Sequence, residues 1–197
     1  MPPQDTLSAA ELAQQYGWSV ALLNSDPSLK ALFTKAVAET WAPDKFVAEL
    51  RNTSWFKKNS DTAREMAVLR TTDPATYTQR VKAQRAQLGQ VAREMGAPIA
   101  GKIMQQIAEQ SLMFGWNDAQ IRQQMAQYIR YAGEGKLSGL AAQVEDEVRR
   151  HAQAMGVRVS HRFITAGAQQ VATGEATIEQ LRDRLNQQAI SAYPHLA

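Results

Sequence analysis

Apolar residues recur along most of the chain at the three- and four-residue spacing of an amphipathic helix. The first clear group is Leu29, Leu32, Phe33, Ala36 and Val37, which would form one face of a helix. The same spacing recurs in Phe46 with Leu50; Tyr77, Val81 and Leu88; Ile99, Ile103 and Ile107; Ile121, Met125 and Ile129; Val144, Val148 and Met155; and Ile178, Leu181 and Leu185. Because no stretch alternates as a half-buried strand would, we predict an all-α protein of about nine helices.

Residues typical of helix starts and helix ends separate these groups. Three capping boxes are predicted, in which a side-chain oxygen accepts from a backbone amide three residues later: Ser8 with Glu11, Asn117 with Gln120, and Thr177 with Gln180. Asp26-Pro27 and Asp73-Pro74 each offer a capping carboxylate followed by a proline, which suits a first helical position. Breaks are predicted at Gly96, Gly115, Gly133 with Gly135, Gly156 and Gly174.

Two stretches in the second half of the chain are similar at an offset of about 60 residues. Met95-Gly96 corresponds to Met155-Gly156, and the run from Gln120 to Met125 corresponds to the run from Gln180 to Leu185. A third copy near Trp41 is conceivable. We therefore predict stacked helical hairpins with a weak repeat of about 60 residues. The expected division is a subdomain of residues 1–95 and a hairpin-repeat subdomain of residues 96–197, with packing as one domain as the alternative.

The composition is that of a globular protein. Apolar residues make up 44% of the 197 residues and charged residues 21%, which is enough to bury a core. There is no cysteine, so disulfides and thiolate metal sites are excluded. The start of the chain lacks the basic region of a secretory signal, and no apolar run approaches the roughly 20 residues that span a bilayer. We expect no membrane span.

Positive charge is concentrated in the middle of the chain, within the first predicted subdomain. Residues 51–93 contain nine Lys or Arg and only three acids, whereas the whole chain carries a formal charge of +3. The nine are Arg51, Lys57, Lys58, Arg64, Arg70, Arg80, Lys82, Arg85 and Arg93. Such a segment is either a solvated helix face or a contact surface for nucleic acid or an acidic protein.

The residue patterns of common catalytic and metal sites were not found. His151, His161 and His195 have no ligand partner at helical spacing, so we interpret them as surface or core residues. The acids Glu145, Asp146 and Glu147 are interpreted as residues of a helix start, where they complement the helix dipole. We expect no catalytic residue, no cofactor, no metal and no small-molecule substrate.

The tryptophans suggest packing and contact roles. Trp18, Trp41 and Trp116 are predicted to wedge between helices, each with its indole N–H on a free carbonyl. In Trp55-Phe56-Lys57-Lys58, two aromatic residues stand beside two basic residues in a predicted loop, which makes this segment a candidate contact with a partner or with nucleic acid.

Five stretches of the chain together resemble parts of one protein module. The resemblance is carried by Tyr16-Gly-Trp-Ser-Val-Ala-Leu-Leu-Asn-Ser-Asp-Pro-Ser-Leu-Lys-Ala-Leu-Phe and by Trp41-Ala-Pro-Asp-Lys-Phe. It continues through Leu50-Arg-Asn-Thr-Ser-Trp-Phe-Lys-Lys-Asn, Asp61-Thr-Ala-Arg-Glu and Thr72-Asp-Pro-Ala-Thr-Tyr77, and is looser beyond residue 90. The module that these stretches resemble occurs in large proteins of tailed phages that infect actinobacteria, and the resemblance implies a helical, repeated module of virion structural proteins of the tail.

Three functions are therefore expected, in decreasing order. The first is a non-enzymatic virion component of the tail, made in the host cytoplasm, which binds copies of itself or neighbouring virion proteins. The second is a nucleic-acid-binding or packaging protein of the phage head. The third is a helical wall-degrading enzyme, since some relatives are fused to such domains. The predicted partner-binding residues are Trp55, Phe56, Lys57, Lys58, Arg80, Lys82 and Arg85.

Overall fold

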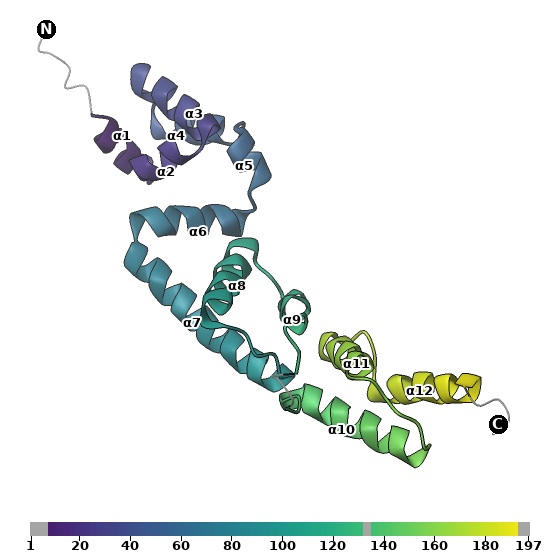
Figure 1. Ribbon diagram of the computed structural model, residues 1–197. Helices are drawn as coiled ribbons and strands as arrows, with labels where there is room; N and C mark the ends of the chain where they lie inside the picture. Colours follow the sequence, from purple (N-terminus) through teal and green to yellow (C-terminus); the bar gives the residue numbers. More distant parts are fainter. Residues whose placement is uncertain (1–7, 132–134, 193–197) are drawn as a thin grey trace, which may run out of the picture. The chain divides into compact units, whose positions relative to one another are not determined.

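The computed structural model describes residues 8–131 and 135–192 (Figure 1). These residues form twelve helices and no strand, so the predicted all-α class is confirmed. The helices are α1 (Ala9–Gln15), α2 (Val20–Ser25), α3 (Pro27–Ala38), α4 (Pro43–Leu50), α5 (Ser54–Lys58), α6 (Asp61–Thr72), α7 (Pro74–Met95), α8 (Gly101–Phe114), α9 (Asp118–Ala126), α10 (Gly139–Ala154), α11 (His161–Thr173) and α12 (Ile178–Ala192). The estimate of nine was low in part because α2 and α5 have only 6 and 5 residues, too few to show a helical period.

The predicted capping signals begin the helices where the sequence places them. Ser8 and Glu11 form a reciprocal capping box at α1, as do Asn117 and Gln120 at α9. The Thr177 hydroxyl likewise accepts from the Gln180 amide at 3.2 Å, and the Gln180 side chain accepts in return at 3.0 Å. The predicted break at Gly133 lies outside the described residues, as does His195.

Several helices end in the same left-handed turn. After α7, the Ala97 amide donates to the Ala92 carbonyl and the Gly96 amide to Arg93, the pattern of a Schellman motif. Gly96 has φ +80°, which suits a residue without a β-carbon. The turn after α3 has the same hydrogen bonds, but its left-handed residue is Thr40, at φ +50°.

The helices group into two compact units. One contains Met1–Ala83 and Glu109–Gly115, and the other Gln84–Ala108 and Trp116–Ala197; we call them unit 1 and unit 2. This division differs from the predicted boundary between residues 95 and 96, because α7 and α8 both continue without a break across the unit boundary.

Unit 1 is built on a cluster of aromatic and branched aliphatic side chains from α1 to α5. Tyr16 stacks on Phe46 with ring centroids 4.1 Å apart, and Trp18 meets Trp55 edge-on at 5.4 Å. The Tyr16 hydroxyl donates to the carbonyl of Trp41 at 2.8 Å, so the one polar group of this pair of rings is satisfied. These contacts make a core from helices too short to be stable alone.

In unit 2, α11 packs on α9, α10 and α12, and small residues allow the close approach. Gly167 of α11 is buried, and a β-carbon there would stand 2.8 Å from the side chain of Leu181 of α12. Local boundaries recur at the predicted offset of 60: α8 and α11 begin at Gly101 and His161, and α9 and α12 begin at Asp118 and Ile178. The internal repeat itself stays a prediction.

Among the described helices, none is both long and apolar enough to cross a membrane, as expected from the sequence.

Candidate ligand and partner sites

The segment Trp55-Phe56-Lys57-Lys58 was predicted to be an exposed loop, and this expectation is wrong. It forms the short helix α5, capped by the Thr53 hydroxyl. Trp55 is only 9% exposed and belongs to the unit 1 core, because it packs edge-on against Trp18. Its backbone amide donates to the hydroxyl of Ser28 in α3 at 3.2 Å, which fixes α5 in place. Trp55 therefore is not an exposed anchor in this conformation.

Phe56 is half-buried, and a basic side chain covers its ring. The guanidinium carbon of Arg64 lies 3.7 Å from the ring centroid, within the range of a cation–π contact. Arg64 also donates to the backbone carbonyls of Phe56 and Asn59, and it pairs with Asp61. Arg64 thus joins the end of α5 to the start of α6 and is not available as a free contact residue.

Lys57 and Lys58 are the exposed members of this predicted site, and both lie in the last turn of α5. Neither forms an ion pair with another described residue. The charge of Lys58 acts on Asp26, whose pKa is lowered chiefly by the hydroxyl of Ser28. The two lysines are therefore exposed, as a contact role requires, whereas the neighbouring Trp55 is buried and Phe56 is half-buried.

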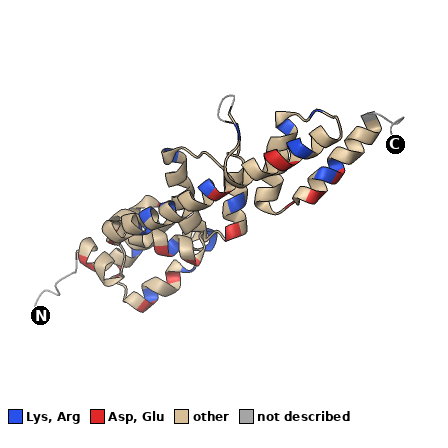
Figure 2. Cartoon of the chain, turned by 90° about the horizontal axis from the view of Figure 1, so that it is seen from below, with Lys and Arg blue, Asp and Glu red and all other residues tan. Residues whose placement is uncertain are grey.

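The other predicted contact residues, Arg80, Lys82 and Arg85, are exposed residues of α7. Arg80 pairs with Glu65 of α6 at 2.9 Å. Because successive residues of a helix are separated by about 100°, Lys82 and Arg85 share one side of α7, whereas Arg80 points in nearly the opposite direction. They do not form a single basic patch. Figure 2 shows basic and acidic residues interspersed along the helices.

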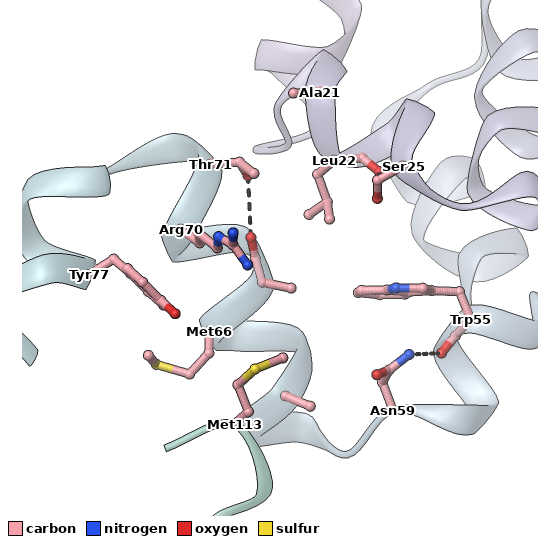
Figure 3. A pocket seen from close by; sticks show the side chains of 12 residues that line it. Ala21, Leu22, Ser25, Trp55, Asn59, Met66, Arg70, Thr71, Tyr77 and Met113 are labelled. Carbon is pink, nitrogen blue, oxygen red and sulfur yellow. Dashed lines mark hydrogen bonds between the residues drawn. The ribbon is translucent and has the colours of Figure 1, made fainter. Parts of the chain in front are cut away.

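An open cavity of about 450 Å³ lies within unit 1, between α2, α5, α6, the start of α7 and the end of α8 (Figure 3). Its walls are mainly apolar. They are formed by Ala21, Leu22, Ser25, Trp55, Asn59, Ala63, Met66, Ala67, Arg70, Thr71, Tyr77 and Met113. Leu22, Trp55, Ala63 and Met66 are buried, whereas Ala21, Ser25 and Arg70 are exposed and mark its mouth.

Some polar side chains of this cavity are hydrogen-bonded to backbone carbonyls, and two others contact each other. Asn59 donates to the Trp55 carbonyl at 2.8 Å, and the hydroxyls of Ser25 and Thr71 donate to carbonyls of their own helices. Arg70 and Tyr77, by contrast, are joined to each other by a cation–π contact of 6.0 Å. Burial, followed by the charge of Glu109, raises the pKa of the Tyr77 hydroxyl, which keeps it a proton donor.

In unit 2, a buried carboxylate has a set of hydrogen bonds that the sequence did not predict. Glu145 is 2% exposed, and it accepts from Tyr131 Oη at 2.9 Å, Arg149 Nε at 2.8 Å and the backbone amide of Leu137 at 2.9 Å. Tyr131 also stacks on His161, with centroids 4.2 Å apart. The expectation that Glu145 belongs to a helix start is wrong, because α10 begins at Gly139 and has no acid in its first turn.

The environment of Glu145 favours its ionised form. Burial alone would raise its pKa, but the hydrogen bonds from Leu137, Arg149 and Tyr131 together outweigh burial, and the pKa is lowered. Burial and the bond to Glu145 raise the pKa of Tyr131. A carboxylate that is ionised and saturated with donors serves as an acceptor that holds its neighbours.

The remaining predicted residues have structural contacts. Trp41 is buried, but its indole N–H donates to the Glu39 carboxylate at 2.7 Å and not to a free carbonyl. His151 is hydrogen-bonded to Asn186 Oδ1 at 2.7 Å, as expected of a structural histidine. Within the described residues, no group of His, Asp and Glu could hold a metal ion.

Sequence reasoning missed the cavity and the Glu145 network for the same reason. Arg70 and Tyr77 belong to different helices, and Tyr131 precedes Glu145 by 14 positions, so no local spacing relates the partners. The only available signal was an acid inside an apolar helical pattern, between Val144 and Val148.

Comparisons with protein-family models, with curated proteins and with solved structures found no match to this chain.

Proposed function

We propose that this chain is a non-enzymatic structural protein of a tailed-phage virion, most closely associated with the tail, which assembles with copies of itself or with neighbouring virion proteins. The proposal is supported by the location of the residues that resemble the phage module. Tyr16, Leu23, Phe33, Phe46 and Trp55 all belong to the buried core of unit 1. The buried residues of the resembling stretches are packing residues, and such residues specify a fold and not a reacting site.

The exposed apolar residues supply candidate contact points for assembly. Val47 on α4 is 42% exposed, and Ile190 on α12 is 55% exposed. In a protein that works through helical faces, such side chains pack into a partner, whereas exposed charges at the rim contribute little affinity.

The test is to locate the protein in purified particles of the phage that encodes it, by mass spectrometry of separated heads and tails. The expected result is a stoichiometric amount in tails. Detection in neither fraction would contradict the proposal. Sedimentation of the purified chain would measure self-association, which the substitution Val47→Ser or Ile190→Ser is expected to weaken without loss of helical content.

A nucleic-acid-binding protein of the phage head is the second candidate, favoured by Lys57 and Lys58, which are exposed and form no ion pair with another described residue. It predicts binding to DNA that weakens steeply as salt rises, because phosphate contacts release counterions. Fluorescence anisotropy with a labelled duplex at 50 and 200 mM salt measures this. A chain found in heads, whose DNA affinity falls in the variant Lys57→Gln/Lys58→Gln, would favour this candidate over the first.

A further inference from the structure

The unit 1 cavity has the dimensions and the lining of a ligand site. Its volume of about 450 Å³ falls in the range of roughly 300–1,000 Å³ that small-molecule sites occupy. Two methionines, Met66 and Met113, line it together with the indole of Trp55. Methionine is flexible and polarisable, so it adapts to an apolar guest of irregular shape. The body of a ligand held here would therefore be apolar.

The charge of the cavity is positive. Arg70 is its one charged lining residue, and none of the twelve lining residues, all in the described part of the chain, is acidic. Arg70 forms no ion pair with another described residue. Burial and the charge of Glu109 raise the pKa of Tyr77, but Glu109 does not line the cavity and has contacts of its own. A ligand group that meets Arg70 would therefore be anionic.

The two polar donors lie on one side of the cavity. Figure 3 shows Arg70 and Tyr77 together on the side opposite Trp55, with Met66 and Met113 between the two sides. A guanidinium donates two parallel hydrogen bonds to a carboxylate, and a phenol hydroxyl adds a third donor. The other lining hydroxyl and amide groups are already hydrogen-bonded within the protein. One polar side and one apolar side match a molecule with one carboxylate and an apolar tail.

We propose that this cavity binds an amphiphilic monocarboxylate of the fatty-acid class, with its carboxylate on Arg70 and Tyr77 and its tail against Trp55, Met66 and Met113. The proposal concerns a bound ligand and no reaction. It goes beyond the proposed structural function and does not depend on it, because virion location and ligand binding are measured separately.

The experiment is a titration of the full chain with decanoate, below its micelle concentration, followed by NMR of ¹³C-methyl methionine. The chain has seven methionines, and of the six in the described residues only Met66 and Met113 line the cavity. Saturable shifts at these two methyls are expected. 1-Decanol, which has the same tail without the charge, is expected to bind about tenfold more weakly.

Variants assign the polar end of the ligand. Arg70→Gln is expected to weaken decanoate about tenfold and to leave decanol unchanged, because Arg70 is exposed and its loss removes no core contact. Tyr77→Phe keeps the ring and is expected to weaken decanoate about threefold. The control is Arg80→Gln, another exposed arginine of unit 1, which pairs with Glu65 and does not line the cavity.

Three outcomes would overturn the proposal. If neither decanoate nor decanol shifts Met66 and Met113, the cavity takes no such ligand. If both bind equally and Arg70→Gln changes neither, the cavity is an apolar site without carboxylate recognition. Equal loss of decanoate in Arg70→Gln and Arg80→Gln would show a general charge effect and would also count against it.

Discussion

Glu145 holds two residues of the segment between α9 and α10, Tyr131 and Leu137. Its two carboxylate oxygens accept from Tyr131 before α10 and from the Leu137 amide just ahead of the helix. Leu137 is itself buried, so an unpaired amide there would cost free energy. The carboxylate therefore contributes to stability through groups that have no other acceptor among the described residues.

This role predicts a pH dependence. The pKa of Glu145 is lowered in the fold, so its contribution to stability is present above the unfolded-state pKa of about 4.3 and is lost as the pH falls through the folded-state value. We expect Glu145→Gln to lower the free energy of unfolding by about 2 kcal/mol at pH 7 and by much less at pH 3. Urea unfolding followed by circular dichroism at both pH values measures the difference.

The matched control is the neighbouring Asp146→Asn. Asp146 is exposed and pairs with Lys136 at 3.6 Å, so the expected change is within about 0.5 kcal/mol. A Glu145→Gln variant with the same pH dependence as the unchanged chain would show that the carboxylate makes no such contribution.

Thr40 is the described non-glycine residue with a positive φ, and it stands in the glycine position of a helix-ending turn. A β-branched residue pays about 1–2 kcal/mol in this region of backbone space. We expect Thr40→Gly to raise the free energy of unfolding by about 0.5–1 kcal/mol, after the extra entropy of glycine in the unfolded chain is subtracted.

Denaturant titration of Thr40→Gly beside Thr34→Gly tests this prediction. Thr34 is exposed in the interior of α3, where glycine should destabilise by about 0.5 kcal/mol. Opposite signs are expected for the two variants, and a loss of stability in both would be evidence against strain at Thr40.

At the scale of helices, α5 shows how a short element depends on its packing. Its five residues cannot form a stable helix alone, and Trp55 supplies most of its buried surface. We expect Trp55→Ala to lower the free energy of unfolding by about 3 kcal/mol or more, because it leaves a cavity in the core. The exposed neighbour Lys57→Ala should change it by no more than about 0.5 kcal/mol. Thermal unfolding of both variants separates a core residue from a surface contact.

The junction of α7 and α10 depends on two glycines that admit close backbone approach. A β-carbon on Gly96 would stand 1.8 Å from the Ser138 carbonyl oxygen, and one on Gly139 would stand 2.5 Å from the Arg93 carbonyl oxygen. Neither backbone atom can move as the end of a flexible side chain would. Both glycines also have positive φ.

We therefore expect Gly96→Ala to destabilise unit 2 by about 3 kcal/mol or more. Gly156 is the matched control, since it ends α10 with φ +69° but has no atom within 4 Å of an added β-carbon. Gly156→Ala should lower the free energy of unfolding by only about 1 kcal/mol, the cost of an alanine at positive φ. Hydrogen exchange of α7 and α10 amides measures both effects, and equal costs would mean that backbone strain, and not the close approach, decides.

At the scale of the whole molecule, the division into units makes a prediction about fragments. Unit 1 includes Glu109–Gly115, and Met113 from this segment lines its cavity beside Met66. We expect a fragment of residues 1–115 to unfold cooperatively and a fragment of residues 1–95 to be less stable, since it lacks that segment. Circular dichroism melts of the two fragments test this. Equal melting temperatures would mean that residues 96–115 add nothing to unit 1 and would favour the predicted boundary at 95/96.

The sequence by itself determined the helical class and most helix starts. These features depend on contacts within one or two helical turns. Examples are the capping boxes at Ser8 and Asn117 and the apolar spacing of α3, for which the local sequence is sufficient to predict the helix. It did not determine which aromatic is buried. Trp55 next to two lysines has the local pattern of an exposed contact, and only its packing on Trp18 makes it core.

The tertiary structure alone decided the cavity and the Glu145 network. Arg70, Tyr77 and Met113 meet because three helices converge, and Tyr131 meets Glu145 although 14 positions of sequence separate them. These contacts join side chains of different helices, and the packing of the helices sets how far apart the side chains lie. The local sequence around a residue does not predict those distances. The ligand site could therefore be inferred only once the fold was known.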